Sequence, residues 1–362
     1  MKKGLLAALL LAALAVVSGC QTIRFYGQAV KGEVSILVRE QPIEKLLANP
    51  QTPARLKGQL QLVQQLRAFA ETNLKLPVNG HYRKYVDVHR AFVVWNVEAA
   101  PEFSLEPKSW WYPFVGRLEY RGYFSEGSAR RYGSRLEKKG NDVHVGGVEA
   151  YSTLGSFADP VLNTFILDAE GDLAELIFHE LAHDRVFARG DTDFNEAFAT
   201  SVGQKGARRW LRAKGDSTAL ESYLAHLRRN DQFVHLIAQT REQLAALYGD
   251  ERTEGGKVKA TKNKRDVPVE QLRQQKKRIL AQLQQDYAQL KAKWGGNTEY
   301  DGWFAHPVNN AKLNSVAAYY DLVPGFDRLL ELNSGDLAKF YDAAKRLSKE
   351  PKKTRQQRLR TR

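Results

Sequence analysis

Apolar residues along the chain follow two different periods, and the change between them divides the sequence. Over residues 26–76 they recur mostly at helical spacing, whereas residues 81–168 are rich in aromatic and β-branched side chains, which is typical of strands and ordered loops. Helical spacing returns over residues 202–248 and in three later segments, 268–294, 311–322 and 334–349. The pattern predicts an α+β fold that is predominantly α-helical, with a small mixed or antiparallel sheet.

The length and the apolar content suit one elaborated domain. The chain has 362 residues, of which 43% are hydrophobic, enough for a sizeable core. We expect a single domain over residues 20–350. A polar, basic loop and the helix after it, residues 249–295, are predicted to form an inserted arm. Residues 351–362 are charged and are predicted to be a disordered basic tail.

Residues 1–20 have the organisation of an export signal. Two lysines precede an unbroken apolar run over residues 5–17, and Val-Ser-Gly-Cys follows that run. The run is shorter than the roughly 20 apolar residues that a membrane-spanning helix needs. Because the four residues resemble a bacterial lipobox, we expect removal of residues 1–19 and a lipid anchor on Cys20, the only cysteine. Gln21 resembles the residue found there in outer-membrane lipoproteins, so we expect a lipid-anchored protein of the bacterial cell envelope that faces the periplasm.

The net charge of +14 is concentrated in two segments. Residues 257–278 carry a net +7 and residues 345–362 a net +8, which leaves the rest of the chain close to neutral. No aromatic residues interleave the charges of the arm, and an exported protein rarely meets nucleic acid, so a nucleic-acid interface is not expected. The arm and the tail could instead contact anionic lipid or lipopolysaccharide, although a solvated surface is the simpler interpretation.

The segment around position 180 carries the candidate chemistry. It contains His179-Glu180-Leu-Ala-His183 behind an apolar lead-in. On a helix with about 3.6 residues per turn, the two histidines project from one face and can bind one Zn²⁺ ion. Glu180 lies about 100° round that helix, where it can act as a general base without being a ligand. Because a buried cluster of these groups would be costly without a metal, we predict a zinc site here.

A catalytic zinc site needs a third protein ligand, and Glu196 is the candidate. Gly190 is predicted to stop the first helix and Asp193 to N-cap the next, which puts Glu196 in its first turn. The alternative is that Glu196 forms a capping box with Asp193. A metzincin site is excluded, since Val186 and Arg189 occupy the positions where that class needs Gly and His or Asp.

A set of short blocks, spread over most of the chain from Tyr120 to Phe326, resembles a known family. The blocks are Tyr120-Arg-Gly-Tyr-Phe124, Ala150-Tyr-Ser-Thr-Leu-Gly155, Leu176-Ile-Phe-His-Glu-Leu-Ala-His183, Phe194-Asn-Glu-Ala-Phe-Ala-Thr200, and Asn309-Asn-Ala311 with Tyr319 and Val323-Pro324. Their order resembles that of a bacterial family of predicted aminopeptidases, zinc enzymes that are often lipoproteins.

The resemblance implies a zincin-like catalytic core in which a helical hairpin carries the metal ligands. His179, His183 and Glu196 would bind Zn²⁺, and Glu180 would be the general base, as in gluzincins. Only 12 residues separate His183 from Glu196, fewer than in the best-known gluzincins, so the hairpin must be tight.

The resemblance also suggests where a peptide would bind. Gluzincins place a sheet edge that pairs with the substrate backbone just before the zinc helix, which points to Ala150, Tyr151 and Ser152. Asn310 is a further expected substrate contact. An ordinary core strand is the alternative for this segment. Glu149 is a weak candidate for holding a substrate amine.

A donor for the oxyanion is expected from a later helix. By its position in the family blocks the candidate is Tyr319, with Tyr320 and His306 as alternates. A core aromatic with a satisfied hydroxyl is the alternative for either tyrosine. His144 has no partner at metal spacing and is not expected to be a ligand.

Two functions remain open at this point. The first is a zinc-dependent peptidase, an aminopeptidase by resemblance, that cuts peptides while tethered to the membrane by its lipid. The second is a non-catalytic envelope lipoprotein in which zinc only stabilises the fold.

Overall fold

The computed structural model describes residues 24–112, 116–150, 158–252, 258–259, 267–320 and 322–360, with the backbone alone at 252, 258–259 and 317–320. Over these ranges the protein is predominantly helical, with sheets of two or three strands, which confirms the predicted fold class. None of the helices in these ranges is both long and apolar enough to cross a membrane.

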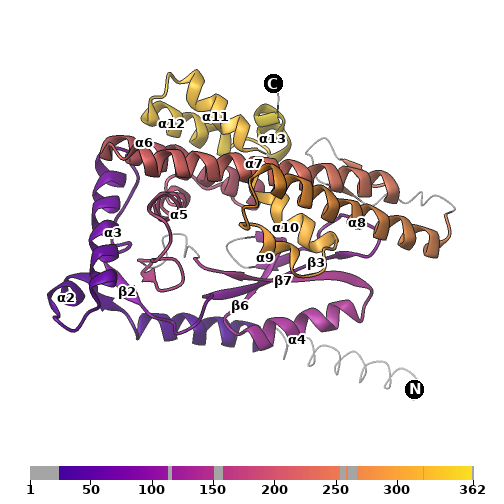
Figure 1. Ribbon diagram of the computed structural model, residues 1–362, viewed down its shortest axis with the longest axis horizontal. Coiled ribbons are helices and arrows are strands. Elements are labelled where there is room, and N and C mark those ends of the chain that lie inside the picture. Colours follow the sequence, from indigo (N-terminus) through magenta and orange to yellow (C-terminus); the bar gives the residue numbers. More distant parts are fainter. Residues whose placement is uncertain are drawn as a thin grey trace, which may run out of the picture.

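A three-stranded antiparallel sheet lies across the middle of the molecule (Figure 1). Its central strand β3 (Val94–Pro101) pairs with β6 (Arg121–Tyr123) on one side and with β7 (Asn141–Val148) on the other. Helix α4 (Glu126–Glu137) covers one face, where Val97 and Ala99 pack with it in one apolar cluster. Because side chains alternate along a strand, Glu98 projects from the opposite face. Helix α10 (Asn310–Tyr320) lies on that side of the sheet.

Helix α4 corrects the expectation of strands and loops throughout residues 81–168. Its buried positions are Ala129, Gly133 and Leu136, which lie on one helical face. Two of the three are small residues that add little to an apolar pattern, and most of the other positions are charged or polar. The segment is therefore too polar overall to stand out as a packed helix.

The second layer is built from long helices. Helix α5 (Glu170–His183) runs beside α6 (Thr192–Lys214), and both pack on α7 (Ser217–Tyr248) and on α3 (Ala54–Thr72). The sequence predicted one helical stretch from residue 202 to 248, but a left-handed Gly215 separates α6 from α7. Asp216 then N-caps α7 by accepting a hydrogen bond of 2.9 Å from the amide of Ala219.

Glycines allow α5 and α6 to approach closely. A Cβ atom at Gly203 of α6 would lie 2.8 Å from the backbone oxygen of Glu175 and 3.2 Å from the Cβ of His179. A Cβ at Gly206 would lie 2.6 Å from the ring of Phe178. Larger residues at either position would separate the two helices beside the histidines.

Shorter elements complete the fold at its edges. Helices α2 (Ile43–Ala48) and α9 (Asp301–Phe304) are short. Residues 24–37 form a further helix. Strands β1 (Gln41–Pro42), β2 (Lys84–Val86) and β8 (Val161–Leu162) form a second three-stranded sheet, and β8 leads into α5. Two hairpins pair β4 (Trp110–Tyr112) with β5 (Gly116–Leu118) and β9 (Glu251–Arg252) with β10 (Val258–Lys259).

The predicted basic arm contains helix α8 (Val269–Lys293), which lies along α7 (Figure 1). Lys276 of α8 donates to the carboxylate of Asp142 at 2.5 Å and to the carbonyl of Glu102 at 2.8 Å. Arg273 pairs with the Glu102 carboxylate at 2.8 Å. Several of the arm's cations are therefore bonded to the body of the protein.

The C-terminal helices α11 (Val323–Leu332), α12 (Leu337–Ser348) and α13 (Lys352–Arg360) lie on the side of α6 away from α5 (Figure 1). Helix α13 corrects the expectation of a disordered tail. Its Arg355, Gln356 and Leu359 are buried, and a Cβ at Gly325 of α11 would lie 2.2 Å from the carbonyl oxygen of Leu359. The segment is too polar to predict as a packed helix, because its buried side chains are mostly an arginine and a glutamine.

Candidate metal centre

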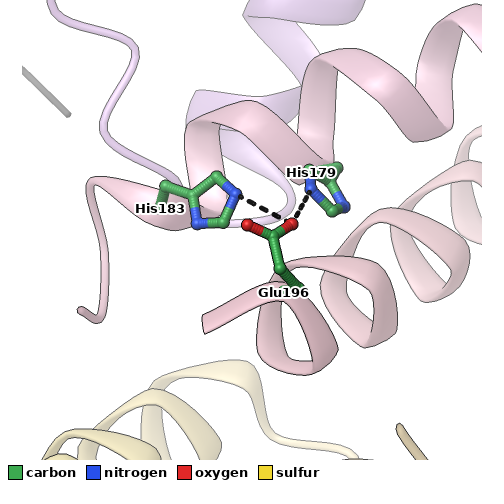
Figure 2. A group of neighbouring side chains, drawn as sticks. All are labelled: His179, His183 and Glu196. Carbon is green, nitrogen blue, oxygen red and sulfur yellow. Dashed lines mark ion pairs between the residues drawn. The ribbon is translucent and has the colours of Figure 1, made fainter. Parts of the chain in front are cut away.

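The antiparallel pair α5 and α6 brings three potential ligands together. His179 and His183 lie one turn apart at the end of α5, and Glu196 faces them from the beginning of α6 (Figure 2). The Nε2 atoms of His179 and His183 lie 3.4 Å and 3.8 Å from Oε2 of Glu196. The potential ligand atoms of all three residues lie within 4.8 Å of one another.

This donor set fits a zinc ion. Ligands at about 2.0–2.1 Å from Zn²⁺ in a tetrahedron lie about 3.4 Å from one another. The two His–Glu separations are close to that value, so small side-chain adjustments would allow all three groups to bind one ion. Two imidazoles and one carboxylate are also the protein ligands of well-known catalytic zinc sites.

Burial and neighbouring charges together shift the pKa values of these groups in different directions. Burial lowers the pKa of His183 to about 4, which favours the neutral imidazole that a metal needs. The pKa of Glu196 is lowered, because the charges of His183 and His179 and the bond to His179 outweigh the effect of burial. For His179 the effect of burial is outweighed by the bond to Glu196 and by the charges of Glu180 and Glu196, so its pKa is raised.

Glu180 lies beside this group without being part of it. Burial raises its pKa to about 7, the charge of His179 opposes this shift, and the charge of Glu196 adds to it. A carboxyl group with a pKa near neutrality is suited to accept and release a proton. A bound divalent cation would lower this pKa again.

The connection between the two helices is fixed by Asn195, whose role the sequence reasoning missed. This buried side chain accepts a hydrogen bond of 2.7 Å from the amide of Ala188 and donates one of 3.0 Å to its carbonyl. Gly190, in the same loop, has a φ of +73°. Because Asn195 directly precedes Glu196, these bonds fix the first turn of α6 and the direction of the Glu196 side chain.

Helix α6 begins two residues earlier than the sequence predicted. Asp191, not Asp193, occupies the N-cap position, although its side chain makes no capping bond. The carboxylate of Asp191 instead accepts bonds from Arg355 (2.7 Å) and Gln356 (3.1 Å) of α13 and pairs with Lys352 at 2.8 Å. A capping box between Asp193 and Glu196 is therefore not formed, and the C-terminal helix holds the start of the ligand helix.

One residue of α6 supports a histidine of the site from behind. The hydroxyl of Thr200 on α6 lies 3.5 Å from Nδ1 of His179, close enough to help orient the ring. The Nδ1 atom of His183 is buried and has no hydrogen-bond partner among the described residues. Asp184, the next residue, bonds instead to Nε2 of His81 at 2.9 Å. Bonds to Asp159 and Asp184 raise the pKa of His81 to about 9, and this buried pairing anchors the end of α5.

Tyr120 lies within electrostatic range of this group of residues. Burial raises its pKa, and the negative charges of Glu196, Glu180 and Glu98 raise it further. Its hydroxyl therefore stays protonated and can donate a hydrogen bond. Tyr120 opens the first of the sequence blocks given above, which was the available signal for it.

The structure gives less information on the expected oxyanion donors. The backbones of Tyr319 and Tyr320 belong to α10, but their side chains lie outside the described residues. His306 is exposed, in the connection between α9 and α10.

The expected substrate contacts have different outcomes. Ala150 lies just beyond edge strand β7 and packs partly buried against the main core, while Tyr151 and Ser152 lie outside the described residues. Asn310 is a correction. It is fully buried, its amide donates to three backbone carbonyls at 3.0 Å, and its oxygen accepts from Tyr248, so it has no polar atom left for a substrate.

Comparisons with known proteins agree with the resemblance found in the sequence. A family model described as "Putative aminopeptidase" matches residues 24–359. Searches of curated proteins and of solved structures found no match.

Proposed function

The chain belongs to the putative aminopeptidase family, and on that premise we propose that it is a zinc-dependent peptidase. The observation that carries this proposal is the convergence of His179, His183 and Glu196 at distances suited to zinc, with Glu180 beside them. A lipid on Cys20, which lies outside the described residues, would tether the enzyme to the envelope membrane, facing the periplasm.

The residues divide the chemistry between them. His179, His183 and Glu196 would hold the ion. When bound, zinc supplies a Lewis acid that polarises a carbonyl and acidifies water. Glu180 accepts the proton of the attacking water and returns it to the leaving amine. Glu180 is buried beside the three ligands, where its carboxylate can take that proton and give it back.

A hydroxyl donor would stabilise the negative charge that develops on the carbonyl oxygen. Tyr120 suits this role, because its raised pKa keeps the hydroxyl protonated beside Glu196 and Glu180. Tyr319, from α10, stays the candidate from the sequence. Kinetics of the Tyr120→Phe and Tyr319→Phe variants distinguish the two candidates. The substitution that removes the true donor should lower kcat with little change in KM.

The direct test of the proposed function is Glu180→Gln, which keeps the shape of the side chain and removes the base. We expect the purified variant to retain about one zinc per chain, and to lose about 10²- to 10⁴-fold in peptide hydrolysis. Glu170→Gln is the matched control, since Glu170 lies on the same helix but bonds to Trp210 and Lys214.

Two outcomes would contradict the proposal. Full activity of Glu180→Gln would exclude the mechanism. Melting of the protein on chelation, with no peptide cut by the zinc-loaded wild type, would favour the alternative of an envelope lipoprotein with a structural zinc site.

A further inference from the structure

The helix over residues 24–37 has apolar side chains on its outer face. Tyr26, Val30, Val34 and Val38 follow one another at intervals of four residues, and between 38% and 80% of each residue is exposed. This spacing aligns them along one helical face. Val38 still belongs to that face, because its amide donates to the carbonyl of Val34 at 3.0 Å. Among the described residues only nine large hydrophobic residues are exposed, so these four form an apolar stripe rather than scattered surface positions.

The inner face of the same helix is fixed to the body of the protein. Phe25 and Ile36 are buried. The ring of Phe124 occupies the place that a Cβ atom on Gly32 would take, so the helix lies close to the end of β6. The side-chain oxygen of Gln28 accepts a hydrogen bond of 3.0 Å from the amide of Phe124. These contacts fix the rotation of the helix and keep the apolar stripe on the surface.

A pocket lined by arginines, here called the arginine pocket, lies beside the beginning of this helix. It has a volume of about 250 Å³, and its charged residues are Arg24 of the helix, Arg121 of β6, and Arg131 and Arg135 of α4. No described Asp or Glu residue lines it, and none of the four arginines forms an ion pair with a described carboxylate. Four positive charges gathered without a counter-charge attract an anion.

Arg121 is held in the arginine pocket by aromatic rings instead of carboxylates. Its guanidinium carbon lies 4.0 Å from the ring centroid of Phe25 and 4.8 Å from that of Tyr132. Its Nε atom has no hydrogen-bond partner among the described residues. A guanidinium group that is stacked on rings in this way is fixed in place and keeps its full charge, which suits recognition of a phosphate group.

The positive surface continues along α4. Lys108, Lys138 and Lys139 line a neighbouring hollow that shares Arg135 with the arginine pocket, and no described acidic residue lines that hollow. In Figure 1 the indigo helix over residues 24–37 and α4 lie along the same edge of the molecule. A free anion would satisfy the cations but would leave the apolar stripe exposed. An anionic bilayer accounts for both, since it has phosphate groups at its surface and acyl chains below them.

The position of this helix in the chain also favours a bilayer. Arg24 follows Cys20, the proposed lipid site, by four residues. Four residues span no more than about 14 Å even when fully extended, so a lipid on Cys20 would hold the beginning of the helix at the membrane surface. The basic arm and the tail are less suited to this contact, because Lys276 and Arg355 are bonded to carboxylates of the body.

We propose that the helix over residues 24–37 lies in the surface of an anionic phospholipid bilayer, with its apolar stripe at the acyl chains and a headgroup phosphate in the arginine pocket. The choice of a bilayer as the partner rests in part on the proposed lipid anchor, and nothing in the inference depends on the peptidase chemistry. The contact gives the protein a fixed orientation on the membrane. Because α5 and α6 lie on the other side of the central sheet from α4 (Figure 1), the candidate metal centre would face away from the bilayer.

The experiment measures the protein surface without the lipid. Residues 20–362 with Cys20→Ser are sedimented with vesicles of phosphatidylethanolamine and phosphatidylglycerol, and with vesicles of phosphatidylcholine alone. We expect binding to the anionic vesicles to be at least about tenfold stronger. Equal binding to both kinds of vesicle, or binding to neither, would overturn the proposal. Tight calorimetric binding of inorganic phosphate without any binding of vesicles would do the same, and would assign the arginine pocket to a free anion.

Variants separate the two parts of the surface. Val30→Ser with Val34→Ser removes apolar contact, and Arg131→Gln with Arg135→Gln removes two charges from the pocket. All four residues are exposed, so folding should not change. Each double variant should bind anionic vesicles about tenfold more weakly.

The matched control removes two exposed charges from the basic arm, in Lys277→Gln with Arg278→Gln on α8. It should bind like the parent protein. Loss of binding in this variant, with unchanged binding of the stripe and pocket variants, would place the membrane contact on the arm and overturn the proposal.

A fluorescent label reports which face touches the bilayer. Once Cys20 is replaced the chain has no cysteine, so Val34→Cys allows an environment-sensitive dye to be attached at one position. Its emission should shift to the blue on addition of anionic vesicles, whereas a dye at Leu332→Cys on α11, also exposed, should not respond. The opposite result would overturn the proposal. None of these readouts requires turnover, so they hold even if no peptide is cut.

Discussion

Glu196 and Glu98 are two largely buried carboxylates, yet their pKa values shift in opposite directions. The pKa of Glu196 is lowered, because two histidines of the same helical pair face it and outweigh burial. The pKa of Glu98 is raised to about 8 by burial alone. The hairpin of α5 and α6 therefore carries groups that stabilise the charged form of its carboxylate, whereas Glu98 on β3 has none among the described residues and its neutral form is favoured.

The first and largest predicted effect comes from removing a cation that pairs with a buried carboxylate at the start of α6. Arg355→Met would leave the buried Asp191 with only Lys352 and Gln356. We expect a loss of about 3 kcal/mol in the free energy of unfolding, as for a broken buried ion pair, and weaker zinc binding because the start of α6 loosens. Urea denaturation and zinc titration would measure both.

Arg358→Gln is the control on the same helix. Arg358 is largely exposed and lies 3.4 Å from Glu350, so its loss should cost no more than about 1 kcal/mol. Equal stability losses in the two variants would show that α13 does not support the ligand helix.

The second prediction concerns the close approach of the hairpin helices. Gly203→Ala places a methyl group 2.8 Å from the carbonyl oxygen of Glu175 and beside His179. We expect a stability loss of about 2 kcal/mol from overpacking, together with weaker zinc binding. Thermal unfolding with and without zinc would show this.

Gly58→Ala on α3 is the matched change without a clash, because no atom lies within 4 Å of its added Cβ. It should stabilise the helix by about 0.5–1 kcal/mol. If Gly203→Ala were equally stabilising, the separation of the two helices would not be set by that glycine.

The third prediction concerns the protonation of Glu98 and has the smallest expected effect. Since the pKa of Glu98 is raised on folding, the native state binds more protons than the unfolded state between pH 4.5 and about 8. The stability from this group is therefore complete below pH 4.5 and is lost as the pH rises through 8. Because the residue is partly exposed, we expect a loss of about 1 kcal/mol or more.

Denaturant unfolding of wild type and Glu98→Gln at several pH values would measure this. The difference in unfolding free energy between them should change in favour of the variant as the pH rises, while effects of other groups cancel. A difference that is independent of pH would show that Glu98 already has a partner in the folded protein.

The convergence of three potential metal ligands could be predicted from the sequence because they are close in the chain. His179, His183 and Glu196 lie on two consecutive helices, and helical geometry alone aligns the two histidines. The start of α6 was harder to predict. Asp191 and Asp193 are both suitable caps, and the choice depends on Arg355, which is distant in sequence and reaches Asp191 only in the folded protein.

A cavity lined by residues of β3, α6 and α10 could not be predicted in this way. Glu98, Tyr120, Thr192 and Ala311 come from four separate segments, and no local pattern shows that they meet. Asn310 shows the opposite error, because the sequence suggested a functional role for a residue that is structural. The resemblance suggested Asn310 as a substrate contact, but its bonds to three carbonyls between residues 101 and 104 make it a structural residue.

The most direct test of the account is to locate the ion itself by anomalous diffraction at the zinc edge from crystals of the zinc-loaded protein. The account predicts one strong peak about 2.0–2.2 Å from Nε2 of His179, Nε2 of His183 and a carboxylate oxygen of Glu196. A peak bound by other residues, or no peak at saturating zinc with Glu196 still paired to the histidines, would contradict it.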